Sequence, residues 1–244
     1  MSTDASQLAR YVNSITKARG SPWVWIKKLR RYRNTKTGRF IGLAGMLKLR
    51  DRFVDAMLGK AADVAKLLKR DRTQDGINKF VGEARSLIKS IYVDQYILGH
   101  GGRGSMTQAD YGRLGAMLRK QYSYLDRFAG EIADGKYLDE FGELTDQGLN
   151  AISNRLGLYV KSSTAAYERG KTLGMGCPEL PAYPGDGNSE CLTNCRCTWD
   201  IVEFPDRWEA TWRELGDEGT CDTCDYRGST WNPLVLPKLF PDKE

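Results

Sequence analysis

The stretch TQADYGRLGAMLRKQYSYLDRFAGEIADG, residues 107–135, decides the fold class. Its apolar residues recur every three or four positions, which is the period of one helix face. Thr107 and Asp110 have the spacing of a capping box, in which a hydroxyl and a carboxylate bond the free N–H groups at a helix start. Asp134 and Gly135 end the pattern. The stretch predicts a long amphipathic helix whose buried face consists of Tyr111, Leu114, Leu118, Tyr122, Leu125, Phe128 and Ile132.

The same period continues on both sides of this stretch. Residues 43–70 predict one helix, and residues from about 74 to 98 predict another, ended by the glycine-rich residues 99–104. A further helix opens at Leu144 and Thr145 and closes at Gly170 or Gly174. We therefore expect residues 43–174 to form a mainly α, bundle-like body. The predicted apolar face of the first of these helices consists of Leu43, Leu47, Val54, Leu58, Ala61, Ala65 and Leu68.

Composition is that of an ordinary globular chain. The 244 residues are 41% hydrophobic, 10% aromatic and 28% charged, so the chain is long enough to bury a core. No apolar run reaches the length that crosses a bilayer. The polar start MSTDASQLAR predicts that there is no secretory signal. We expect no association with a membrane.

Residues 1–42 predict a basic arm. The first 50 residues hold 12 basic side chains and one acidic side chain, a net charge of +11, whereas the whole chain carries +6. Residues 23–26 have strand composition and residues 34–38 a turn signal, which suits a small hairpin or an extended arm. Such a segment packs on its own acidic body, with Trp23 and Trp25 as core anchors, or binds a protein assembly, or contacts nucleic acid. The candidate partner-binding or DNA-binding residues are Arg30, Arg31, Arg33, Lys36, Arg39, Trp23 and Trp25.

Residues 175–244 predict a small Cys-rich, zinc-ribbon-like subdomain that contains β-strands. All six cysteines lie between residues 177 and 224, and Cys221 and Cys224 form a Cys-x-x-Cys pair that suits one metal ion. The gap after Cys197 suits a hairpin, with strands at 198–204 and 208–212. We expect structural zinc held by Cys221 and Cys224 and by two of Cys191, Cys195 and Cys197. Cys177 is then either a spare thiol or a partner for whichever of Cys191, Cys195 and Cys197 does not bind the metal.

Two other chemistries of these cysteines are weighed against zinc. Without a secretory signal the thiols stay reduced, which disfavours disulfides, although disulfides in a finished particle are an alternative. Redox chemistry is disfavoured because Asp222 and Asp225 flank the Cys-x-x-Cys thiols and raise their pKa.

Enzymatic motifs are missing from the sequence. His100 is the single histidine, which excludes Cys2His2 fingers and His-Glu-x-x-His proteases. Its neighbours Gly99 and Gly101–Gly104 predict a surface loop with nothing to orient the imidazole. The same loop lacks the Lys-Ser/Thr of a phosphate-binding loop. We expect no catalytic residue and no enzyme.

The string from Leu180 to Trp199, with its Asn194-Cys195-Arg196-Cys197 element, resembles the C-terminal signature of tailed-phage minor head proteins, the Mu F-like head-morphogenesis family. Cys221, Cys224, Gly228 and Trp231 resemble another portion of that signature, which here follows the Asn-Cys-Arg-Cys element rather than preceding it. In this chain Leu192 and Thr193 stand where the family commonly has His-Pro. Shorter similarities to phage structural proteins lie at 31–41 and 111–125.

The resemblance implies a non-enzymatic virion protein present in several copies at the portal vertex of the capsid, and in the host cytoplasm during assembly. It implies contacts with the portal or major capsid protein, and with packaged DNA, in head morphogenesis. The alternative hypothesis from another class is a zinc-containing nucleic-acid-binding protein that acts free in the cell. Its DNA affinity would fall linearly with salt on a log–log plot.

Overall fold

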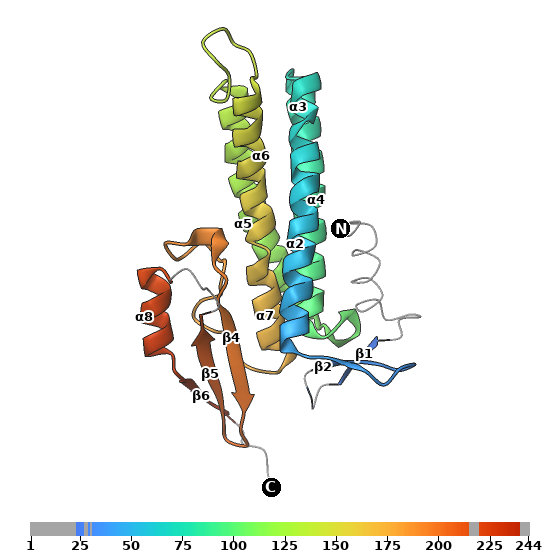
Figure 1. The fold of residues 1–244 in the computed structure, drawn as a ribbon, viewed down its shortest axis with the longest axis vertical. Coiled ribbons are helices and arrows are strands. Elements are labelled where there is room, and N and C mark those ends of the chain that lie inside the picture. The colour runs from blue at the N-terminus through green and yellow to red at the C-terminus, as the bar shows by residue number, and fades with distance from the viewer. Residues whose placement is uncertain (1–22, 27–28, 30, 215–219, 240–244) are drawn as a thin grey trace.

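The structure is a computed structural model that describes residues 23–26, 29, 31–214 and 220–239. A small sheet comes first, a group of long helices follows, and a second small sheet with one short helix ends the chain (Figure 1). The mainly α class and the β-containing Cys-rich end are thus confirmed. None of the helices among the described residues has the length and apolar character needed to span a membrane.

The helical body is built from the segments whose periodicity predicted helices. Its long helices run side by side along the longest axis of the molecule (Figure 1). The predicted capping box is present: the Thr107 hydroxyl accepts from the Asp110 N–H at 3.3 Å, and the Asp110 carboxylate accepts from the Thr107 N–H at 2.8 Å. The helices are α2 (Leu43–Ala65), α3 (Leu67–Arg70), α4 (Gln74–His100), α5 (Gln108–Ala133), α6 (Asp146–Lys161) and α7 (Thr164–Gly174), with a 3-10 turn, η2 (Arg103–Ser105), between α4 and α5.

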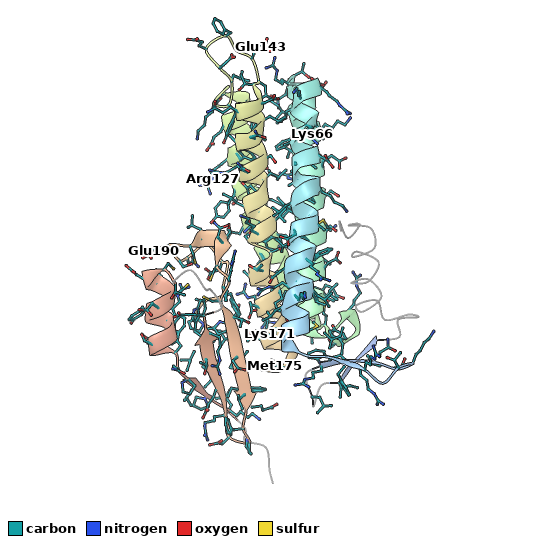
Figure 2. The ribbon with its side chains drawn as sticks, in the orientation of Figure 1. Lys66, Arg127, Glu143, Lys171, Met175 and Glu190 are labelled. Carbon is teal, nitrogen blue, oxygen red and sulfur yellow. The ribbon has the colours of Figure 1, made fainter. Side chains whose placement is uncertain are left out.

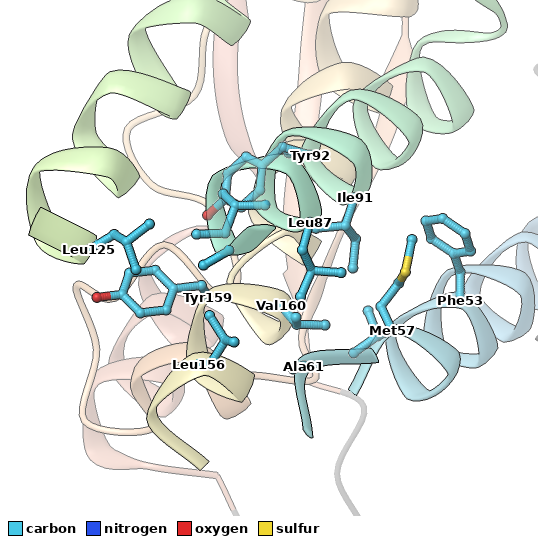
Figure 3. Close-up of a cluster of buried hydrophobic side chains, with 14 of the residues drawn as sticks. Phe53, Met57, Ala61, Leu87, Ile91, Tyr92, Leu125, Leu156, Tyr159 and Val160 are labelled. Atoms are coloured by element: carbon cyan, nitrogen blue, oxygen red, sulfur yellow. The ribbon is translucent and has the colours of Figure 1, made fainter. Parts of the chain in front are cut away.

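The core of the body contains most of the apolar residues predicted from the sequence. Tyr111, expected on the buried face of α5, is instead 44% exposed, and the Leu43 side chain lies outside the described residues. Phe80 of α4 meets Phe128 of α5 edge to face, with 6.0 Å between ring centroids. Leu156 and Val160 of α6 are fully buried in the same cluster. Figure 3 shows this cluster, in which side chains from α2, α4, α5 and α6 converge.

The helix expected from Leu144 or Thr145 to Gly170 or Gly174 is two helices. The Ser162 hydroxyl bonds the carbonyl oxygen of Tyr159 at 2.9 Å, and the Ser163 hydroxyl bonds that of Val160 at 2.7 Å. Serine side chains that bond nearby carbonyls compete with the helical ladder. The chain therefore breaks between α6 and α7, and α7 packs closely on the C-terminal half of α4.

Glycines set the distance between α4 and α7. A Cβ atom on Gly99 would overlap the carbonyl oxygen of Tyr167, and one on Gly170 would overlap that of Tyr96. A Cβ on Gly174 would overlap the carbonyl oxygen of His100. The backbones of α4 and α7 are therefore in direct contact. The N-terminal sheet and the C-terminal unit lie at this same end of the helical body (Figure 1).

The N-terminal sheet consists of β1 (Trp23–Ile26), β2 (Arg31–Asn34) and β3 (Phe40–Ile41), antiparallel in the order β1-β2-β3. Tyr32 is 1% exposed and its hydroxyl donates to the Leu98 carbonyl oxygen at 3.3 Å. Trp25 packs edge to face on Tyr32. The segment expected as a hairpin or extended arm is thus a sheet anchored on α4 from Trp23 onward; the earlier residues of the arm lie outside the described part of the chain.

The C-terminal unit has its own core. The predicted strands are present as β4 (Thr198–Glu203) and β5 (Arg207–Arg213), paired as an antiparallel hairpin. Trp199, Trp212 and Trp231 pack against one another, with ring centroids 5.2–5.9 Å apart. Three further elements, not predicted from the sequence, complete the unit: the 3-10 turn η3 (Leu192–Asn194), α8 (Asp222–Thr230) and β6 (Leu234–Pro237).

Candidate metal centre and basic face

Three cysteine thiols meet beside the Trp core of the C-terminal unit. Cys191 and Cys195 flank η3, and Leu192 between them has a left-handed φ of 51° that turns the chain sharply. Cys224 lies in the first turn of α8. The Sγ atom of Cys224 is 3.8 Å from that of Cys191 and 3.7 Å from that of Cys195, and the three sulfurs lie within 4.8 Å of one another.

These distances match a metal centre better than a disulfide. A disulfide bond is about 2.0 Å long. A tetrahedron with metal–sulfur bonds of about 2.3 Å, the length of zinc–thiolate bonds, has edges of about 3.8 Å. The donor set is soft sulfur, which suits zinc. The geometry and chemistry of the three thiols therefore fit a structural metal ion.

The other two predicted ligands lie next to this group. Cys221 precedes α8 and its thiol contacts those of Cys191 and Cys224. The Cys197 thiol contacts those of Cys195 and Cys224. The structure thus brings three of the five predicted cysteines within 4.8 Å of one another and leaves Cys221 and Cys197 beside them as candidates for a fourth ligand. Cys177 is 2% exposed in the apolar core of the same unit.

The thiols have different affinities for protons. A hydrogen bond from the Cys197 thiol is the main cause that lowers the pKa of Cys195 to about 6. Burial raises the pKa of Cys191 to about 11 and also raises that of Cys224. The pKa of Cys221 is lowered, contrary to the rise expected from its aspartate neighbours, because the N–H groups of Cys224 and Cys191 outweigh its burial. The Cys195 and Cys221 thiols therefore lose their protons more readily than those of Cys191 and Cys224.

Two cationic side chains secure the loops that carry the thiols. Arg227 of α8 is 8% exposed, lies over the rings of Trp212 and Trp231, and donates to the Asn188 carbonyl oxygen at 2.9 Å. The Lys161 ammonium at the end of α6 donates to the Asn194 side chain at 2.8 Å. The first contact fixes α8 on the Trp core, and the second fixes η3 on the helical body.

Two of the predicted basic residues lie on the outer face of the N-terminal sheet, and Lys36 and Arg39 lie exposed in the connection between β2 and β3. Arg31 and Arg33 alternate with buried Tyr32 along β2, so their side chains point outward. Arg33 pairs in register with Val24 and Phe40, and its guanidinium lies 5.8 Å from the Phe40 ring centroid. Both of these neighbours are 45% exposed. We call Arg31, Arg33, Lys36, Arg39, Val24 and Phe40 the basic face.

The positive charge of the basic face is uncompensated by any carboxylate in the described part of the chain, since none of its four cations forms an ion pair there. Asn34 shapes the turn that presents Lys36, because its side-chain oxygen accepts from the N–H groups of Lys36 and Thr37 at 2.9 and 3.0 Å. Trp25 packs inward on Tyr32 and so does not join the basic face. Arg30 and the Trp23 side chain lie outside the described residues.

His100 is not in a surface loop, as the sequence led us to expect. It is the last residue of α4 and is 4% exposed. Its Nδ1 atom is 3.0 Å from the Ser105 Oγ atom and its Nε2 atom is 3.2 Å from an Asp110 carboxylate oxygen. The neighbouring glycines gave the wrong indication because Gly99 packs against α7 and Gly101 caps α4 with a φ of 91°.

Sequence reasoning also missed a buried ionic cluster between the body and the C-terminal unit. Glu168 of α7 is fully buried and bonds the Lys171 ammonium at 2.6 Å, the Thr198 hydroxyl at 2.7 Å and the Trp199 N–H at 3.2 Å. Arg50 of α2 lies 3.3 Å from the same carboxylate. Lys171 also donates to the Trp199 carbonyl oxygen at 2.7 Å. This cluster fixes β4 on α7.

Comparison of the chain with protein-family models, with curated proteins and with solved structures found no match.

Proposed function

We propose that this chain is a structural protein of a tailed-phage head, a minor head protein that acts in head morphogenesis near the portal. In this proposal a zinc ion holds the C-terminal unit together, and the basic face docks on an acidic surface of the portal or capsid. The observation that carries it is the convergence of Cys191 and Cys195 with Cys224. These thiols belong to two separate sequence elements, both of which resemble the signature of that family.

In this role the side chains of the C-terminal unit bind the zinc ion and hold the loops that carry its ligands. Zinc supplies a cross-link of about 10–16 kcal/mol between segments too short to fold alone. Cys191, Cys195 and Cys224 hold it, with Cys221 or Cys197 as the fourth ligand. Arg227 and Lys161 keep the two ligand loops in place.

A structural role for Ser105, His100 and Asp110 agrees with this proposal. The Ser105 hydroxyl lies 2.8 Å from the Gly102 carbonyl oxygen and 3.1 Å from that of His100, both hydrogen-bond acceptors. These residues therefore close the end of α4, and we assign no catalysis to them.

Metal content tests the first half of the proposal. Protein purified under reducing conditions should hold about one zinc per chain, with four thiols shielded until a chelator is added. Cys191→Ser, Cys195→Ser and Cys224→Ser should each lose the metal, and the responses of Cys197→Ser and Cys221→Ser identify the fourth ligand. Cys177→Ser is the control and should keep it. Metal-free protein with six reactive thiols would contradict the zinc centre.

Association with phage heads tests the second half. The chain should co-sediment with heads and bind purified portal subunits. Arg31→Glu with Arg33→Glu should abolish that binding. The same charge change at exposed Lys79 and Lys89 of α4 is the matched control and should not. Zinc-loaded protein that binds neither heads nor portal subunits would contradict the role in the virion.

Nucleic-acid binding by the same face is the second candidate function. Its support is the exposed row of Val24, Arg33 and Phe40, in which a cation and an aromatic ring lie together. Each phosphate contact contributes about −0.9 to the log–log dependence of duplex affinity on salt. If the basic face binds DNA, Arg33→Gln should therefore reduce the slope of log affinity against log salt concentration by about 1. If wild-type protein shows no affinity for DNA, this second function is excluded.

A further inference from the structure

The loop between α5 and α6 forms an acidic tip with one exposed aromatic ring. Phe141 is 82% exposed and lies between Glu140 and Glu143. Figure 2 labels Glu143 at this tip, at the far end of the helical body from Lys171 and Met175. Glu140 pairs with no cation among the described residues. Glu143 pairs with Arg72 of the neighbouring segment at 3.1 Å.

Hydrogen bonds hold the tip in one shape. The Asp139 carboxylate accepts from the N–H groups of Phe141 and Glu143, at 3.0 and 2.8 Å. The Asp139 N–H donates to the Glu143 carbonyl oxygen at 3.0 Å, and Gly142 completes the turn with a φ of 77°. Because the loop is ordered before any partner binds, little entropy is lost when the Phe141 ring is buried by one.

The opposite end of the molecule carries an apolar cleft. It has a volume of about 180 Å³ and lies among the N-terminal sheet, α2, α7 and β4. A cavity of about 150 Å³ lined by apolar side chains accepts benzene, so this cleft has room for a phenyl ring. Leu29, 52% exposed, and Arg31 lie at its open side. The lining includes the apolar residues Trp25, Leu29, Met46, Met175 and Ile201 and the charged residues Arg31, Lys171 and Asp200. Lys171 pairs with Glu168 and Asp200 pairs with Arg213, whereas Arg31 forms no ion pair among the described residues.

The tip and the cleft are complementary but lie too far apart to meet within one molecule. The tip offers an aromatic ring flanked by carboxylates, and the cleft offers a mainly apolar cavity with the exposed Arg31 in its lining. The 26 residues of α5 span about 39 Å at 1.5 Å per residue. We propose that the Phe141 tip of one copy of this chain inserts into the cleft of a second copy, in a head-to-tail contact.

Such a contact joins two different surfaces and leaves one tip and one cleft unused in every pair. Further copies can therefore bind at each free end, and the assembly either closes into a ring or extends as a filament. The contact stands on the tip and the cleft alone, and does not require that the protein act in a phage head.

Sedimentation velocity of the zinc-loaded full chain in reducing buffer tests the contact. The wild-type protein should associate as its concentration rises. Phe141→Ser should weaken the association about tenfold or more, because an exposed ring that becomes buried carries a large share of the energy of a small interface. Tyr226→Ser removes an aromatic ring that is 66% exposed on α8 and is the matched control, with association unchanged.

Mixing experiments identify the two halves of the contact. Leu29→Glu places a negative charge on an exposed residue of the cleft lining and should also weaken association about tenfold or more. An equimolar mixture of Phe141→Ser and Leu29→Glu should form a dimer and nothing larger, because each variant retains one working half. Glu140→Arg and Arg31→Glu should each weaken association, and the doubly substituted protein should recover it.

Three outcomes would overturn the proposal. The first is wild-type protein that remains a monomer at every concentration. The second is Phe141→Ser protein that associates as strongly as wild type. The third is association that Phe141→Ser abolishes and Leu29→Glu leaves intact, which would mean that the tip pairs with another tip.

Discussion

Glu168 is the residue on which the attachment of the C-terminal unit depends. Its buried carboxylate faces the Lys171 ammonium and the Arg50 guanidinium, and it also bonds β4. Burial lowers the pKa of Lys171, while the Glu168 carboxylate acts in the opposite direction. Two buried cations thus share one anion.

Glu168→Gln should destabilise the protein by about 3–5 kcal/mol, because it leaves Lys171 buried without a counter-charge. Arg50 keeps its ion pair with Asp51 at 2.8 Å. Urea unfolding at pH 7 measures the change. Glu179→Gln is the control: this carboxylate is 40% exposed and pairs with Arg169, so its loss should change stability by less than about 1 kcal/mol. Equal effects of the two substitutions would contradict the role of Glu168.

His100 should make stability fall as the pH drops from 7 to 5. Burial lowers its pKa below 6.5, although Asp110 opposes the shift. The unfolded chain therefore binds more protons than the folded chain between that lowered pKa and 6.5, and unfolding becomes easier on acidification. The difference in urea midpoint between pH 7 and pH 5 should be smaller in His100→Gln than in the wild type. An unchanged difference would mean that His100 does not titrate in this range.

At the scale of elements, the long helices were predictable because their periodicity and caps repeat along the sequence, as in α5. The break between α6 and α7 at Ser162 and Ser163 was not predictable, because two serines on the polar face of an unbroken helix would give the same sequence pattern. Helix α8 was missed because it buries only Cys224 and Arg227. The Cys centre was predicted as a set of five residues, whereas selection of the compact three needed the fold of η3 and α8.

The crossing of α4 and α7 depends on the absence of a side chain at Gly170. Gly170→Ala should destabilise the protein by about 3 kcal/mol, because the added Cβ would overlap the Tyr96 carbonyl oxygen and push two packed helices apart. Gly130→Ala in α5 has nothing within 4 Å of its new Cβ and should stabilise the protein by about 0.5–1 kcal/mol through helix propensity. Thermal unfolding measures both, and a neutral Gly170→Ala would refute the close crossing.

At the scale of the whole molecule, the described part of the chain contains two separate hydrophobic clusters. One runs from Tyr32 to Tyr167 through the helical body, and the other runs from Ala165 to Cys224 around the Trp rings. Contacts of α7 with β4, including the Glu168 cluster, join them. The proposed metal centre lies wholly on the side of the second cluster. Loss of the metal should therefore affect the two clusters unequally.

Removal of zinc should unfold the C-terminal unit and leave the helical body folded. Four of the six tryptophans, residues 199, 208, 212 and 231, lie in that unit, so tryptophan emission reports its state, whereas circular dichroism at 222 nm reports the long helices. A chelator should shift the emission to the red while most of the 222 nm signal remains, because only the second cluster loses its cross-link. Cys177→Ser should respond like the wild type, and Cys224→Ser should show the red-shifted emission before any chelator is added. Simultaneous loss of both signals would mean that the body depends on the C-terminal unit for its stability, and unchanged emission would mean that the Trp core holds without metal.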